Sequence, residues 1–387
     1  MTTPSVLAPI AAPALGFAPQ SIGVLVSAMY LAAIGSGLIG GHYVRQFGAL
    51  RLSQVAMLLL VFGLLLATIE TAPRFPVLLM LATLSIGIGY GLTNPTSAQV
   101  LSQHASERHR GLIFSIKQTG VPIGVALAGL LIPMFLGWFS WRGAVVAVSV
   151  VIAFELFFLA AYRKRFDRGL QAVKLDWTTL LIHPLRRVLN DPPLRSLAIC
   201  SGCYSGMQVC FLTFLVSDLT LERGFTLTAA AGALATAQIT SIAARPFWGV
   251  IADRYIAPQK LLGLLGVAMA ATLALLGMLS TNASHFLVIA TAMLVAATVV
   301  GWNGVFFAGI AQKVPSHEIA MVIGGTQFVT FAGAMISPLI FAACVTALQS
   351  YSKTYALFSI APLAMGVWLL ITERPSLAPI KAKNDAL

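Results

Sequence analysis

The chain has 387 residues, of which 58% are hydrophobic and only 9% are charged, and its mean hydropathy is +0.89. Soluble domains carry about 25% charged residues, so this composition excludes an ordinary soluble protein and predicts an integral membrane protein. The formal net charge of +12 would suit a nucleic-acid-binding protein, but the placement of the basic residues, described below, explains it without a nucleic-acid partner.

Apolar runs long enough to cross a bilayer recur along the whole chain. About 20 consecutive apolar residues span the hydrocarbon core as a helix. The sequence therefore predicts an all-α membrane protein with eleven spans, at residues 21–43, 52–71, 75–101, 113–137, 141–162, 196–218, 226–252, 260–279, 285–312, 320–346 and 352–373.

The segment before the first span is apolar but short. Residues 5–16 contain Pro9 and Pro13, and at about 1.5 Å per residue they cannot cross a membrane. They are typical of the outer end of a helix whose beginning is missing, and we expect the natural start to lie upstream. The alternative is a protein whose first helix is naturally short.

The basic residues divide unequally between the two sides of the membrane. If the loop after residue 43 is cytoplasmic and the sides alternate, 18 of the 24 Lys and Arg residues face the cytoplasm and four face outside. The other two, Lys117 and Arg245, fall within spans. Because cytoplasmic loops are enriched in Lys and Arg, we predict a multi-pass protein of a bacterial-type inner (plasma) membrane with a cytoplasmic C-terminus.

The longest polar stretch divides the chain in the middle. Residues 163–195 carry eight basic residues, and we interpret them as a cytoplasmic linker. This predicts an N-terminal transmembrane bundle at 1–162, a C-terminal bundle at 196–373 and a cytoplasmic tail at 374–387. The two halves echo each other in their polar motifs, and such internal repeats are typical of secondary transporters.

The clearest repeated motif follows the first span of each half. It reads Gly41-His-Tyr-Val-Arg45 in the first half and Gly249-Val-Ile-Ala-Asp253-Arg254-Tyr in the second. The second copy resembles the loop signature of the major facilitator superfamily. In the first copy Arg45 stands at the family's acidic position, so a basic residue replaces the carboxylate that is thought to latch the outward-facing state.

The resemblance covers essentially the whole chain in segment count, repeat spacing and central loop. It implies the major facilitator fold, two pseudo-symmetric six-helix bundles, here with the first helix truncated at the N-terminus. It also implies that the first, second, fourth and fifth helices of each half line a central cavity. These are the fragment at 5–16 and the spans 21–43, 75–101, 113–137, 196–218, 226–252, 285–312 and 320–346.

Arg245 is the most informative residue of the cavity spans. A guanidinium stays charged at any working pH and is costly to hold at membrane depth. Its spacing from Gln238 and Ser241 places the three on one helical face. One interpretation is an ion pair with Asp253 or another loop acid, or a contact with backbone carbonyls. The other is a bidentate anchor for a carboxylate or small oxyanion.

The surroundings of Arg245 in the sequence favour the second interpretation. The Ala244-Arg245-Pro246 segment resembles the monocarboxylate porters. Its position eight residues before the loop acid is also similar to the oxalate/formate and nitrate porters, which implies substrate contact.

Lys117 is the second cation within a span. It either extends to the cytoplasmic interface or faces Arg245 across the cavity. In the same span Gly120, Gly124 and Ala128 recur at every fourth position, which predicts close packing against another helix.

Uncharged polar residues on the cavity spans complete the candidate site. Any one of them is also explained by hydrogen bonding between helices. Together they offer partners for a small polar ligand, with Tyr204 and Trp302 as aromatic walls. The candidate substrate-binding residues are thus Arg245, Lys117, Gln238, Gln208, Tyr204, Asn303, Gln327 and Asn94.

Other chemistry finds little support in the sequence. There is no nucleophile elbow, phosphate loop or metal-spaced histidine cluster, so we predict no enzyme and no cofactor. Cys200 and Cys203 have a CxxC spacing, but they lie in an apolar span and we interpret them as packing residues. We place only one acid within a span, Glu155, in a support helix. A cavity with two bases favours anions.

We therefore predict a monomeric secondary transporter that moves a small organic anion, a monocarboxylate, by alternating access. Proton symport is the expected coupling, because a proton that moves with a monoanion makes the step electroneutral. One alternative is an efflux pump for hydrophobic drugs or metabolites. The other is a non-transporting membrane sensor or scaffold built on a degenerate porter fold.

Overall fold

The computed structural model describes residues 18–69, 75–104, 110–167, 182–314 and 319–372. Within these ranges the chain forms helices joined by short turns, and strands are absent. Ten helices are long and apolar enough to cross a membrane, and a shorter apolar helix covers Ile22–Gly37. The predicted all-helical membrane architecture is confirmed. The fragment at 5–16 and the tail at 374–387 lie outside the described residues.

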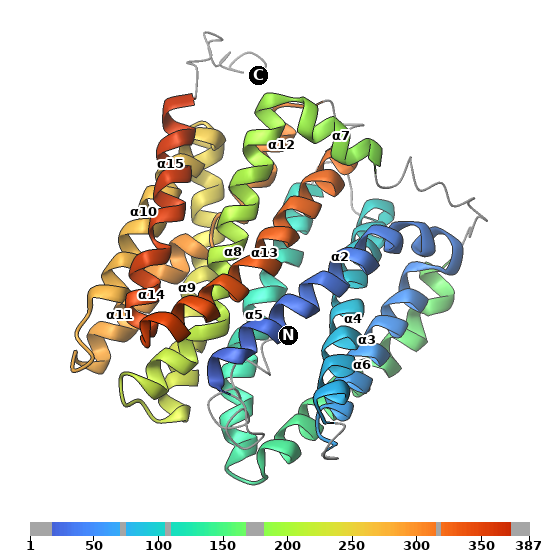
Figure 1. The fold of residues 1–387 in the computed structure, drawn as a ribbon. Coiled ribbons are helices and arrows are strands. Elements are labelled where there is room, and N and C mark those ends of the chain that lie inside the picture. The colour runs from blue at the N-terminus through green and yellow to red at the C-terminus, as the bar shows by residue number, and fades with distance from the viewer. Residues whose placement is uncertain (1–17, 70–74, 105–109, 168–181, 315–318, 373–387) are drawn as a thin grey trace, which may run out of the picture.

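The helices of the N-terminal half pack on one another (Figure 1). The turn η1 (Pro19–Ser21) leads into the first of them, and α4 lies between α2 and α3, while α6 packs on α3. Their bounds agree with the predicted spans to within a few residues: α2 (Ile22–Phe47), α3 (Ala49–Leu66), α4 (Phe75–His104), α5 (Arg110–Leu136) and α6 (Trp141–Phe166).

The C-terminal half begins with α7, a short helix within the predicted linker, and continues through eight further helices. In this half α8 packs on α13, α9 on α11, and α10 on α15. The bounds are α7 (His183–Asn190), α8 (Pro192–Leu221), α9 (Leu227–Arg254), α10 (Pro258–Met278), α11 (His285–Val299), α12 (Asn303–Ala311), α13 (Ile319–Leu348), α14 (Tyr351–Phe358) and α15 (Ile360–Thr372).

Two spans that the sequence predicts as continuous are divided. The span at 285–312 breaks at Val300–Trp302, where the indole Nε1 of Trp248 donates to the Ala297 carbonyl at 2.8 Å. The span at 352–373 breaks at Ser359. There Pro362 lacks the N–H that would continue the ladder.

The two halves meet through two helix pairs, α2 with α13 and α5 with α9. At the α5–α9 contact a Cβ on Gly129 would lie 2.6 Å from the Ala231 carbonyl, so the backbones touch. Gly120 and Gly124, in contrast, have open space around them. The prediction that these two glycines make the close approach is wrong, because the contact lies about two turns further along the helix.

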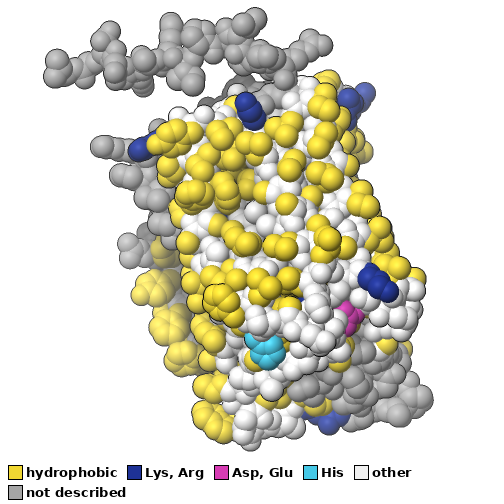
Figure 2. All heavy atoms as spheres, turned by 90° about the vertical axis from the view of Figure 1, so that its left-hand side faces the viewer, with side chains coloured by type: hydrophobic (Ala, Val, Ile, Leu, Met, Phe, Trp, Pro, Cys, Tyr) yellow, Lys and Arg dark blue, Asp and Glu magenta, His cyan; other side chains and the backbone are white. Residues whose placement is uncertain are grey.

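The outer surface suits a lipid environment. On the face formed by α10, α11 and α15, hydrophobic side chains cover the middle, and Lys and Arg lie mainly near its ends (Figure 2). Exposed members of this face include Met278, Phe286, Leu294 and Ile371. An apolar surface of this extent marks contact with a membrane or a partner, and together with the ten candidate spans it shows a multi-pass membrane protein.

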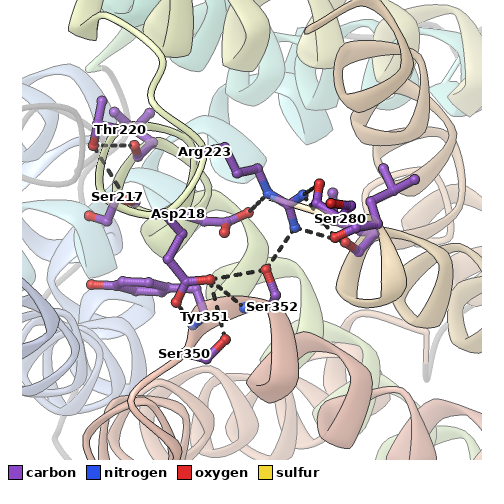
Figure 3. Close-up of polar contacts among 12 residues, drawn as sticks. Ser217, Asp218, Thr220, Arg223, Ser280, Ser350, Tyr351 and Ser352 are labelled. Atoms are coloured by element: carbon purple, nitrogen blue, oxygen red, sulfur yellow. Dashed lines mark hydrogen bonds and ion pairs between the residues drawn. The ribbon is translucent and has the colours of Figure 1, made fainter. Parts of the chain in front are cut away.

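A buried ion pair fastens the end of α8 (Figure 3). Asp218 and Arg223 have fully buried side chains, and Arg223 Nε lies 3.1 Å from Asp218 Oδ2. Arg223 Nη2 also donates to the Leu276 carbonyl at 2.9 Å and to Ser352 Oγ at 2.8 Å, which joins α8 to α10 and α14. The expectation that Glu155 is the only acid within a span is wrong. Asp218 closes the predicted span, whereas Glu155 is exposed on α6.

A second carboxylate stabilises the start of α3. Asp167, just after α6, accepts hydrogen bonds from the backbone N–H groups of Leu50 at 2.8 Å and Arg51 at 2.9 Å. Gly48 precedes the helix with φ +97°, and a Cβ there would collide with the Asp167 side chain. Negative charge at a helix N-terminus is favourable, so Asp167 ties α6 to α3 on the linker side of the half.

Candidate substrate site

Arg245 lies between the two halves. It is half-buried on α9, and its Nε donates to the Val300 carbonyl at 3.2 Å. Its Nη1 donates to the Gln118 carbonyl of α5, in the other half. Within the described part of the chain, its hydrogen-bond partners are carbonyls rather than carboxylates. These contacts use two of its five N–H groups, so further donors remain for an anion.

The break between α11 and α12 provides one of these carbonyls. The Val300 carbonyl accepts from Arg245 and also from Asn303 Nδ2 at 3.4 Å. Asn303 Nδ2 and Trp302 Nε1 each donate to Gln208 Oε1 at 3.2 Å. The structure therefore brings three predicted residues, Arg245, Asn303 and Gln208, into one network around the break.

Two other predicted residues are placed differently. Tyr204 is fully buried, and its hydroxyl donates to the Leu262 carbonyl of α10 at 2.8 Å. Its ring meets Trp302 edge to face at 5.9 Å, and Trp302 is itself only 1% exposed, so neither ring forms the open aromatic wall that the sequence predicts. Gln238 is also fully buried and accepts from Ser241 Oγ at 3.4 Å, as their shared face predicts. Neither side chain is open to a ligand in this conformation.

The remaining predicted binding and loop-motif residues lie on helices α2, α4, α5, α9 and α13. Lys117 and Gln327 are half-buried on α5 and α13. Gly249 has open space around it, and Arg254 is exposed. Asn94, Gly41, Arg45 and Asp253 belong to helices α4, α2 and α9, but their side chains lie outside the described part of the chain.

The sequence analysis missed an aromatic cluster. The rings of Tyr30 on α2, Tyr90 on α4 and Phe331 on α13 form a triangle with centroid separations of 5.8 to 6.3 Å. Tyr90 also lies within electrostatic range of Arg245. All three belong to spans expected to line the cavity, and Phe331 follows Gln327 by one helical turn. The position of Phe331 on the same helical face as Gln327 is the sequence signal that could have pointed to this cluster.

The four cysteines are free. Among the residues with described positions, no group of three or more His, Cys, Asp or Glu side chains is arranged to hold a metal ion.

A bundle of membrane-crossing helices in two halves, with a half-buried cation at their contact, defines a transporter rather than an enzyme. Comparisons agree. The sequence profile described as Major Facilitator Superfamily matches residues 1–338. The chain therefore belongs to the Major Facilitator Superfamily.

Relatives with assigned names are transporters. The chain is 30% identical to "Sugar transport protein 12" of Arabidopsis thaliana over 201 residues, which cover 47% of this chain and only 39% of that protein. It is 26% identical to the "3-(3-hydroxy-phenyl)propionate transporter" of Escherichia coli over 327 residues, which cover 83% of this chain and 77% of that protein.

Solved structures share the fold. A POT family transporter crystallised with 5-aminolevulinic acid superposes with a TM-score of 0.77, over 96% of this chain and 91% of that chain, at 13% identity. At this low sequence identity, the similarity concerns the fold alone. It agrees with the predicted major facilitator architecture.

Proposed function

We propose that this transporter carries a small organic anion, a monocarboxylate, and that Arg245 binds the carboxylate. The observation that carries the proposal is the position of Arg245 between the halves, bonded to a carbonyl of each. A carboxylate accepts two parallel N–H bonds from a guanidinium, so it competes well with neutral carbonyls for the same donors. The named substrate of the E. coli relative is also a monocarboxylate.

The neighbouring polar groups extend this site. Asn303 and Gln208 stand next to the Val300 carbonyl that holds Arg245 and are positioned to orient the anion. Lys117 and Gln327 face the same inter-half region by the family plan and assist. We further propose that the bundles 1–162 and 196–373 rock about this site.

The proposal includes a setting for transport. We place the protein as a monomer in a bacterial inner membrane with its C-terminus in the cytoplasm, as the charge distribution favours. A proton accompanies the anion, because this keeps the step electroneutral.

Uptake of labelled monocarboxylates into proteoliposomes tests the proposal. Arg245→Gln should weaken apparent affinity at least about tenfold, since hydrogen bonds to charged groups contribute about 1.5–3 kcal/mol. Arg245→Lys should recover part of the loss, because it keeps the charge but not the fork. Arg195→Gln is the matched control: Arg195 is exposed on α8 and bonds only the nearby Leu189 carbonyl among the described contacts.

Three outcomes decide between the proposal and its rivals. Equal uptake by wild type and Arg245→Gln would remove Arg245 from the site. Uptake no greater than in empty vesicles, together with drug-dependent survival of an expressing strain, would favour efflux. The absence of both uptake and drug-dependent survival would favour a sensor or scaffold.

A further inference from the structure

The cluster of Tyr30, Tyr90 and Phe331 has three properties of a ligand-binding wall. It joins the halves, because Tyr30 and Tyr90 belong to the N-terminal half and Phe331 to the C-terminal half. The two tyrosines are half-buried, whereas Phe331 is only 8% exposed, so the tyrosines provide the accessible part of the cluster. The geometry is open rather than stacked: Tyr30 and Tyr90 meet edge to face at 82°, and Phe331 is tilted against both.

The cluster and the cation of the proposed site both lie at the contact between the halves. Arg245 donates to a carbonyl of each half, and the cluster joins rings of both halves. On α13, Gln327 precedes Phe331 by four residues, which places an amide and a ring on one helical face. One end of the site is thus cationic and the other is aromatic.

We infer that the substrate is an aryl-substituted monocarboxylate, whose carboxylate binds Arg245 and whose ring packs among Tyr30, Tyr90 and Phe331. The inference rests on the proposed function and narrows it to a substrate class. A carboxylate separated from an aromatic ring by a short linker matches a guanidinium next to an aromatic cluster. A purely aliphatic acid would bind the same cation but has no ring that could add to the edge-to-face and tilted contacts of the cluster.

Aromatic geometry makes this inference selective. Rings attract each other edge to face or offset, through their quadrupoles, beyond the effect of buried area. A saturated ring of the same carbon count buries similar apolar area but has no such quadrupole. Discrimination between phenyl and cyclohexyl acids therefore reports the aromatic wall, whereas discrimination by size alone does not.

The experiment measures counterflow in proteoliposomes, which requires no gradient of the coupling ion. Labelled 3-phenylpropionate, 3-cyclohexylpropionate and butyrate are compared with the wild-type protein. We expect apparent affinity for the phenyl acid to exceed that for the cyclohexyl acid by about 3- to 10-fold. Phe331→Leu should bring this ratio close to one. Phe157→Leu, at a residue 76% exposed on α6, should leave the ratio unchanged.

The outcomes separate this inference from the proposed function. If wild type moves the cyclohexyl acid as well as the phenyl acid while butyrate also enters, the aryl inference fails and monocarboxylate transport stands. If none of the three acids enters vesicles that contain folded protein, both fail. The wild-type comparison decides the matter even if Phe331→Leu does not fold. A ratio that Phe331→Leu leaves unchanged in folded protein would overturn the assignment of the wall.

Discussion

Two arginines inside this membrane protein, Arg223 and Arg245, have different kinds of hydrogen-bond partner. Arg223 is fully buried and has a carboxylate, Asp218, beside it. Arg245 is half-buried and bonds only to carbonyls among its described partners. Burying an ion is costly unless a counter-charge and hydrogen bonds compensate. The first arrangement pairs the guanidinium with a carboxylate and joins α8 to α10 and α14, which is a structural role, whereas the second leaves positive charge for a ligand to neutralise.

The buried ion pair gives a prediction about stability. Arg223→Met leaves the Asp218 carboxylate buried without its counter-charge, and breaking such a pair costs about 3–5 kcal/mol. The double variant Asp218→Asn/Arg223→Met removes both charges and should be less destabilised than the single variant. Thermal unfolding in detergent, monitored by size-exclusion chromatography, measures the difference in stability between the single and the double variant.

An exposed pair serves as the control. Arg187 and Asp191 lie 2.8 Å apart with side chains about one third exposed, at 33% and 30%. Exposed pairs contribute about 0–1 kcal/mol, so Arg187→Met should change the unfolding temperature little. A single Arg223→Met variant as stable as wild type would show that the pair is not important for the fold.

At the scale of elements, the apolar runs predict the spans well but not their interruptions. Hydropathy reports which residues prefer lipid, so the ends of α3 to α6 agree with expectation to within a few residues. Next to the break at Val300–Trp302, Trp248 of a different helix donates a hydrogen bond to the Ala297 carbonyl. A contact between residues distant in the sequence leaves no periodic signal within the span. The sequence does not predict the capping role of Asp167 for the same reason, since its partners Leu50 and Arg51 are distant in the sequence.

That cap can be tested directly. Asp167→Ala removes the acceptor for the Leu50 and Arg51 N–H groups, and loss of an N-cap side chain costs about 0.5–2 kcal/mol. We expect a lower unfolding temperature, with Asp167→Asn in between because an amide still accepts. Ser140→Ala is the matched control, since Ser140 caps α6 through a longer bond of 3.4 Å. Equal effects at both positions would contradict a specific role for Asp167.

At the scale of the whole molecule, the helices that meet between the halves, α2 with α13 and α5 with α9, all belong to spans that the family plan assigns to the cavity. Arg245, Asn303 and Gln208 share one hydrogen-bond network around the break between α11 and α12. The family plan does not distinguish which face of a cavity helix is open, so Tyr204 turns out to bond toward α10 and the Tyr30–Tyr90–Phe331 cluster is missed. Asp218 is missed because it stands at the last position of its predicted span, where hydropathy does not separate buried from exposed.

The inter-half contact at α5 and α9 yields a prediction about transport. Gly129→Val adds a branched side chain whose Cβ would lie 2.6 Å from the Ala231 carbonyl, so the two helices must separate. We expect counterflow to fall severely. Gly124→Val, in the same helix but with open space around it, should retain most of the activity. Comparable transport by both variants, at matched protein levels, would mean that the close contact is not required.

The network around Arg223 also constrains the order in which the protein can be completed. Asp218 and Arg223 are only five residues apart, so they can pair as soon as the end of α8 leaves the ribosome. The Leu276 carbonyl becomes available with α10, and Ser352 Oγ only with α14, near the end of the chain. A nascent chain that stops before residue 350 therefore holds a buried guanidinium with an unfilled donor. Synthesis of the last helices satisfies the polar groups at the end of α8, and the C-terminal half should resist proteolysis only after that point.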